Sequence, residues 1–143
     1  MIYPDEQVEG EFKPTTIGQS LNDSFMIRLE MAAQISRFTE SPIETMFGLA
    51  MLERIHDPDW ELIPQLIWGR YRIDWVLRRD GKPDIFIECD GNEFHTSELA
   101  VARDKRRDAE IVAAGIKVIR FTGSEIFNDA AGCANQIYRE AML

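Results

Sequence analysis

The stretch "RYRIDWVLRRDGKPDIFIEC", residues 70–89, decides the fold. Apolar and polar side chains alternate over residues 71–79, which is typical of a β-strand with one buried face. The Gly and Pro of "GKPD" favour a tight turn, and "IFIEC" then predicts a second, more deeply buried strand. The stretch therefore predicts an antiparallel hairpin.

The sequence on either side of this hairpin predicts two more strands and four helices. Residues 61–69, "ELIPQLIWG", predict a strand in which Pro64 indicates a sheet edge or a bulge, and residues 116–121, "IKVIRF", predict another. Helical spacing of apolar residues marks residues 22–38, 41–55, 97–115 and 124–143. A strand joined to a later strand through one helix makes a parallel pair. The order α-α-β-β-β-α-β-α therefore predicts an α/β (α+β) fold with a mixed sheet flanked by helices.

Several residues mark the expected ends of these helices. Ser41 precedes a proline and lies three residues before Glu44, the pattern of an N-cap with proline at the first helical position. Ser124 is the expected cap of the last helix, and Gly115 is expected to close the third. Residues 1–20, rich in Pro and Gly, are expected to form an arm or loop.

The composition predicts a cytoplasmic globular protein. The chain has 143 residues, enough for one domain, and 45% of them are hydrophobic. It contains no run of 18 apolar residues and its start is acidic, so neither a membrane span nor a signal peptide is expected. Cys89 and Cys133 have no partners at metal-ligand spacing, which predicts two free thiols in a reducing compartment.

The charge is unevenly distributed. The formal net charge is −9, which argues against a polyanionic partner. Residues 70–120, however, hold 11 Lys or Arg and 10 Asp or Glu, whereas the remainder holds 5 basic and 15 acidic residues. Because the local potential governs contact with nucleic acid, the total weakens a nucleic-acid function without excluding it, and predicts modest affinity.

Acidic side chains end the second strand of the hairpin, where burial makes charge costly. Because side chains alternate along a strand, Glu88 and Asp90 share the face of Phe86. On the preceding strand, Asp74 is expected on the face opposite Ile73, so it can stand beside Glu88 or Asp90. Close carboxylates repel one another, and a divalent cation resolves the conflict; oxygen ligands favour Mg²⁺ or Mn²⁺ over zinc.

The same acids have an alternative interpretation as a structural salt-bridge network. In it, Glu88 and Asp90 pair with nearby arginines, of which the candidates are Arg72, Arg103 and Arg107. Asp90 before a glycine is also ordinary turn chemistry. Asp74 is harder to explain in this way, because Asp in the middle of a strand is disfavoured.

His95 and a charged helix follow this strand. Histidine can give or accept a proton near neutral pH, so His95 is a candidate general base or acid; the alternative is an ordinary surface histidine. Arg103 and Arg107 share a helix face at i,i+4. With Lys105 they are candidates to hold phosphates, while Asp104 would orient His95 or a water. The alternative for this charge run is a solvated helix face.

Two further polar residues have strong structural explanations. Glu44 fits the capping box Ser41-x-x-Glu44, and capping competes with metal binding for the same carboxylate. Gln65 lies in an otherwise apolar strand and needs a partner, which a satisfied edge amide would provide.

The order of these motifs resembles the PD-(D/E)XK (restriction-endonuclease-like) nuclease superfamily. The motifs are Glu44 on a helix, Gln65, "YRIDW", "IECDGNEFH", "RDKRRD" and "GIKVIRF", over roughly residues 41–128. They are most similar to the very-short-patch-repair endonuclease-like branch and related homing endonucleases. Each motif alone is weak, whereas the combination is specific.

The resemblance implies a restriction-endonuclease-like core and Mg²⁺-dependent cleavage of DNA phosphodiesters. It implies metal binding by Asp74, Glu88 and the helical Glu44, with His95 and Asp104 as the loop His and helix Asp. Asp90 occupies the position of the superfamily Lys, which is the main departure from the pattern. In the branch that the chain resembles this position varies, and the His takes part instead.

The expected function is therefore that of a metal-dependent DNA endonuclease. Residues 41–143 would form the nuclease-like domain and residues 1–40 an N-terminal arm and helix, within a single domain. Arg103, Arg107 and Arg120 would contact backbone phosphates, which positions DNA without reading its sequence. Gln65 and Lys105 are further candidate substrate-binding residues. Because there is no separate recognition module in the sequence, specificity is expected from loops, residues 1–40, a homodimer or a partner protein.

Three alternatives remain open at this stage. The first is a catalytically inactive nuclease fold used for interaction or DNA binding. The second is an RNA-cleaving enzyme with the same residues. The third is a structural domain whose acids are all paired with arginines.

Overall fold

The computed structural model describes residues 16–91 and 97–143, with side chains from Phe25 onward. The elements follow the predicted order. They are α1 (Thr16–Ser36), α2 (Pro42–Leu52), β1 (Trp60–Trp68), β2 (Tyr71–Arg79), β3 (Ile85–Asp90), α3 (Glu98–Ala113), β4 (Lys117–Thr122) and α4 (Gly123–Ala141). Within the described helices, no segment has the length and apolar character needed to cross a membrane.

The sheet is mixed, as predicted, with strand order β1-β2-β3-β4. β1 pairs with β2 and β2 with β3 in antiparallel fashion, whereas β3 and β4 are parallel. Pro64 lies in β1, and that strand forms an edge of the sheet, which fits a residue that cannot donate to a second neighbour.

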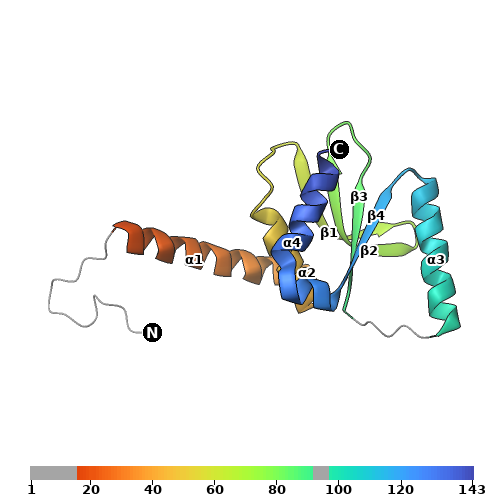
Figure 1. The fold of residues 1–143 in the computed structure, drawn as a ribbon, viewed down its shortest axis with the longest axis horizontal. Coiled ribbons are helices and arrows are strands. Elements are labelled where there is room, and N and C mark those ends of the chain that lie inside the picture. Colours follow the sequence, from red (N-terminus) through yellow and green to blue (C-terminus); the bar gives the residue numbers. More distant parts are fainter. Residues whose placement is uncertain (1–15, 92–96) are drawn as a thin grey trace.

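Helices cover both faces of the sheet. α2 and α4 pack together on one face, over a core that includes Trp75, Ile87 and the buried side chains of both helices. α3 covers the other face, where Ile111 packs on Phe86. α1 packs against α2 and projects away from the sheet (Figure 1). The predicted arrangement of helices on both sides of the sheet is therefore confirmed.

The alternation along β2 breaks at its middle, which corrects one expectation. Regular alternation would put Ile73 and Trp75 on one face, opposite Asp74, but Ile73 packs with Val76 and Phe86 in the core beneath α3. The β1–β2 register pairs Pro64 with Trp75 and then Leu66 with Ile73, so the intervening residues are left out of the ladder. Strict alternation requires a regular ladder, and here the ladder is interrupted beside Asp74.

Two helix boundaries also differ from the prediction. α1 begins at Thr16 instead of residue 22, because Gly18, taken as a loop signal, lies inside the helix; a helix tolerates a glycine at a cost of about 1 kcal/mol. α4 is capped by Thr122 instead of Ser124. The Thr122 hydroxyl accepts from the Glu125 N–H at 3.1 Å while the Glu125 carboxylate accepts from the Thr122 N–H at 3.1 Å. This reciprocal pair satisfies two backbone donors at once.

A close helix–strand contact fixes the position of Trp75, next to Asp74. A Cβ on Gly48 of α2 would lie 2.3 Å from Cζ2 of the Trp75 ring. Gly48→Ala is therefore expected to lower the free energy of unfolding by about 1–3 kcal/mol, since the ring has to move within a packed core. Urea unfolding measures the change. Gly91→Ala is the control, because its Cβ would meet no atom within 4 Å; equal stability of the two variants would contradict the expected clash.

Candidate active site

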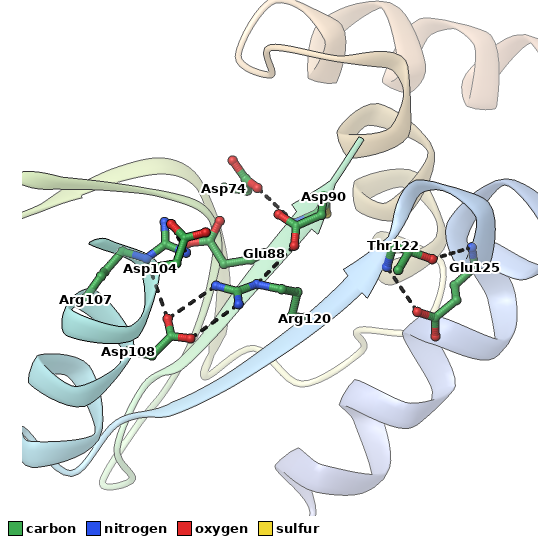
Figure 2. A network of polar contacts seen from close by, with 10 residues as sticks. Asp74, Glu88, Asp90, Asp104, Arg107, Asp108, Arg120, Thr122 and Glu125 are labelled. Atoms are coloured by element: carbon green, nitrogen blue, oxygen red, sulfur yellow. Dashed lines mark hydrogen bonds and ion pairs between the residues drawn. The ribbon is translucent and has the colours of Figure 1, made fainter. Parts of the chain in front are cut away.

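The candidate site lies where β2 and β3 stop pairing. The described β2–β3 ladder runs from Leu77↔Ile85 to Trp75↔Ile87. Beyond it, Oδ2 of Asp74 accepts a hydrogen bond from the backbone N–H of Cys89 at 2.9 Å (Figure 2). A carboxylate thus takes the place of a strand carbonyl, and the sheet itself fixes Asp74 at the end of the hairpin ladder.

The backbone of β1 is strained opposite this point. Gln65 has φ of +52°, in the left-handed region that residues with a Cβ rarely adopt. Its side-chain amide donates a hydrogen bond to Oε1 of Glu44, while its own Oε1 is buried with no hydrogen-bond partner. Gln65 was predicted to need a hydrogen-bond partner, and that partner is Glu44. Backbone strain of this kind costs about 1–3 kcal/mol and clusters at functional sites.

Glu44 is buried, and both of its oxygens accept hydrogen bonds. Gln65 occupies Oε1, and the Ser41 hydroxyl donates to Oε2 at 2.9 Å. The same hydroxyl accepts from the Glu44 N–H at 3.3 Å, so Ser41 caps α2 as predicted. Burial raises the pKa of Glu44, and the nearby charge of Asp74 raises it further. Glu44 therefore lies within electrostatic reach of Asp74 but is held by other partners.

Glu88 carries a buried carboxylate that is only partly satisfied. It is 4% exposed, and its Oε1 has no hydrogen-bond partner. Burial raises the pKa of Glu88 to about 9, with a further rise from the charge of Asp74 and an opposing effect of Arg107. The effect of the Asp74 charge on the pKa of Glu88 places the two carboxylates within electrostatic reach of each other. This agrees with the predicted proximity of Asp74 and Glu88, which stays a prediction.

Two arginines balance the acids, which partly supports the salt-bridge alternative. Nη1 of Arg107 lies 3.7 Å from Oε1 of Glu88, and Nε of Arg120 lies 3.2 Å from Oδ2 of Asp90. Burial raises the pKa of Asp90, and the charge of Arg120 opposes the rise. Of the three arginines named as candidate partners of these acids, Arg107 pairs with Glu88, whereas Arg72 pairs with Glu40 at the surface.

Asp108 joins the two arginines, and it was not among the residues predicted from the sequence. Its carboxylate accepts two hydrogen bonds from Arg120, both of 3.3 Å, and its Oδ1 lies 3.6 Å from Nε of Arg107 (Figure 2). Asp104, one turn earlier on α3, lies 4.0 Å from Nη2 of Arg107. The i,i+4 spacing of Asp104 and Asp108 was the available signal, but it did not distinguish an internal network from a solvated face.

The remaining predicted residues have different outcomes. Arg103 and Lys105 are exposed on α3 and form no ion pair with the described residues. His95 lies outside the described residues. Arg107 and Arg120 are half-buried among acids, so they are less available to phosphates than the sequence suggested.

The oxygen atoms at this site are of the kind that bind Mg²⁺ or Mn²⁺, although they are not arranged as a complete metal site. Among residues 16–91 and 97–143, no three His, Cys, Asp or Glu side chains are placed to hold a metal ion. Two buried oxygens nevertheless lack a hydrogen-bond donor, namely Oε1 of Glu88 and Oε1 of Gln65. Unpaired buried oxygens beside a second carboxylate suit Mg²⁺ or Mn²⁺.

Comparison with known proteins assigns the chain to a family. A search of curated proteins finds no match. Residues 47–140, more than half of the chain, match the sequence model described as REase_MTES_1575. The matched segment includes Asp74, Glu88 and both arginines of the network, and it begins just after Glu44. The chain therefore belongs to the restriction-endonuclease-like family REase_MTES_1575.

Proposed function

We propose that the protein is a metal-dependent DNA endonuclease that hydrolyses phosphodiester bonds. The observation that carries the proposal is the buried carboxylate of Glu88, whose Oε1 lacks a hydrogen bond, on the strand to which Asp74 is hydrogen-bonded. Burying two carboxylates against each other costs stability, and a divalent cation offsets that cost. Membership of a restriction-endonuclease-like family supports this proposal.

The side chains of the site have distinct proposed roles. Asp74 and Glu88 would hold Mg²⁺ or Mn²⁺, and Glu44 would join them if it exchanged one of its hydrogen bonds. The bound metal would lower the pKa of a water and stabilise charge on the phosphoryl oxygens. The hydrogen bond from the Cys89 N–H orients Asp74, while burial keeps bulk water away from Glu88.

We assign proton transfer to the segment after β3. His95 would act as general base or acid, oriented by Asp104. Similarity to the very-short-patch-repair endonuclease-like branch is part of the proposal, through the motif "IECDGNEFH". Sequence specificity would come from the N-terminal segment, a second copy of the chain or a partner protein.

The exposed cations of α3 are the proposed contacts with DNA phosphates. Arg103→Ala is expected to weaken DNA binding several-fold with little change in kcat, because a phosphate contact positions the duplex without taking part in the reaction. The salt dependence of binding should fall by about one unit in the slope of log K against log salt. Fluorescence anisotropy with a labelled duplex measures both quantities.

The matched control for Arg103 is Arg139→Ala, which removes an exposed arginine from the last turn of α4. It should leave affinity and salt slope unchanged within error. Equal losses in both variants would show a general effect of net charge and contradict a phosphate contact on α3.

Incubation with supercoiled plasmid and Mn²⁺ or Mg²⁺ tests the nuclease function. The protein should convert the plasmid to nicked or linear forms, and chelation by EDTA should stop the reaction. The same assay with RNA separates DNA cleavage from RNA cleavage. No conversion above the level of an Asp74→Asn variant would contradict the proposal.

A second candidate function is that of a nuclease fold without catalysis. The observation that favours it is the pairing of Glu88 with Arg107 and of Asp90 with Arg120, which balances the charge of the acids without a metal ion. Such a protein would bind DNA or a partner and show no Mn²⁺-dependent gain in thermal stability. A gain that disappears in Glu88→Gln would argue against it.

A further inference from the structure

Asp108 occupies the centre of the charge network on the α3 side of the sheet. It accepts two hydrogen bonds from the terminal nitrogens of Arg120, and its Oδ1 also faces Nε of Arg107 at 3.6 Å. Arg120 lies on β4 directly beside Glu88 in the parallel register. Asp108 therefore restrains the arginine that is the cross-strand neighbour of the buried acid.

The arginines approach the acids without satisfying them. Arg107 stops 3.7 Å from Oε1 of Glu88, beyond hydrogen-bond distance, and Arg120 approaches Asp90 through Nε without forming a hydrogen bond. Oε1 of Glu88 and the Nε atoms of both arginines are consequently buried without hydrogen-bond partners. Unsatisfied groups of opposite charge so close together would pair if their side chains were free to move.

The restraint on Arg120 explains why it does not pair with Glu88. With both terminal nitrogens bound to Asp108, Arg120 cannot turn its planar fork toward Glu88, which is the geometry that arginine prefers with a carboxylate. The guanidinium still lies close enough to lower the electrostatic cost of the acids. Figure 2 shows Arg120 between Asp108 on one side and Asp90 on the other.

We propose that Asp108 is a positioning residue that holds Arg120 away from Glu88, so that the Glu88 carboxylate stays open to a divalent cation. This inference rests on the metal site of the proposed function, but it does not require that the protein cleaves DNA. In the absence of Asp108, Arg120 competes with the cation for the carboxylate of Glu88.

A double-mutant cycle on Mn²⁺ affinity tests this role. The free Mn²⁺ signal in electron paramagnetic resonance measures binding to the parent chain, Asp108→Asn, Arg120→Gln and the double variant. Asp108→Asn is expected to weaken Mn²⁺ binding about five- to tenfold, a coupling within the range of residues in one network. In the Arg120→Gln background the same substitution should weaken it less than about twofold, because the competing arginine is gone.

Three outcomes would overturn the inference. Equal losses in both backgrounds would show that Asp108 acts through its own charge, and no loss in either would show that it plays no part in binding. Lack of Mn²⁺ binding by the parent would remove the site itself. Glu110→Gln controls for lost charge on α3, since Glu110 pairs with Arg70 at the surface. Asp108→Ala enters the same cycle, so the answer does not depend on the folding of one substitution.

The cycle and the plasmid assay separate the two proposals. Coupling between Asp108 and Arg120 in a chain that does not nick DNA would support the positioning role and contradict the nuclease function. Nicking without coupling would do the reverse.

Discussion

Asp74→Asn is expected to lower the rate of plasmid nicking at least about 100-fold while the protein remains as stable as the parent. The amide oxygen of Asn can still accept the hydrogen bond from the Cys89 N–H, so the sheet keeps its geometry. The charge that would bind the metal is lost, and with it several kcal/mol of transition-state stabilisation. Nicking time courses and thermal unfolding of the same preparations measure the two effects.

Asparagine is the informative substitution because alanine would confound the two effects. Asp74→Ala leaves the Cys89 N–H without its acceptor, which costs about 1–3 kcal/mol whatever the function of the site. Asp84→Asn is the matched control, since Asp84 pairs with Arg78 near the β2–β3 turn; it should nick at close to the parental rate. Parental activity in Asp74→Asn would contradict a role of this carboxylate in catalysis.

Glu88→Gln is expected to raise the stability of the metal-free protein and to remove its response to Mg²⁺. The buried carboxylate lacks a hydrogen bond on Oε1, so a neutral side chain of the same shape should stabilise the fold by about 1–3 kcal/mol. The parent should gain about 2.7 kcal/mol at a Mg²⁺ concentration 100 times its Kd. Thermal unfolding with and without Mg²⁺ measures both changes.

The control for Glu88 again comes from α3. Glu110→Gln removes one acidic charge at the surface and should keep the full response to Mg²⁺. If Glu88→Gln also kept the parental gain, Glu88 would not be a metal ligand, and the metal would have to bind elsewhere.

The element order and the mixed sheet were predictable from local patterns, and the same patterns predict that the two central acids lie together. Alternation placed Glu88 on the face of Phe86, and the hairpin spacing brought Asp74 beside it, because regular strands have one register once the turn is known. Ile73 was misplaced for the same reason. The pattern assumes an unbroken ladder. Pro64 indicated an edge or a bulge in this strand, but it did not show that the ladder skips Gln65 and Asp74.

The partners of charged residues were much less predictable. Arg120 was expected to face DNA, yet it is held by Asp108 on α3 and by Asp90 on the neighbouring strand. Such contacts depend on how α3 lies over the sheet, which is set by packing around Ile111 and not by charge spacing along the chain. The prediction of the α4 cap was wrong for a local reason. Thr122 and Ser124 are both acceptable N-caps, but only Thr122 has a Glu three residues later.

The point at which the hairpin ladder stops has a mechanical consequence. Asp74 belongs to the half of the sheet built on β1 and β2, whereas Glu88 and Asp90 are carried by the parallel pair of β3 and β4. The Asp74–Cys89 hydrogen bond connects these two halves beyond the last pair of the β2–β3 ladder. A small change in the angle between the halves therefore changes the distance between Asp74 and Glu88. A ligand that binds both acids would also restrict the movement of the two halves relative to each other.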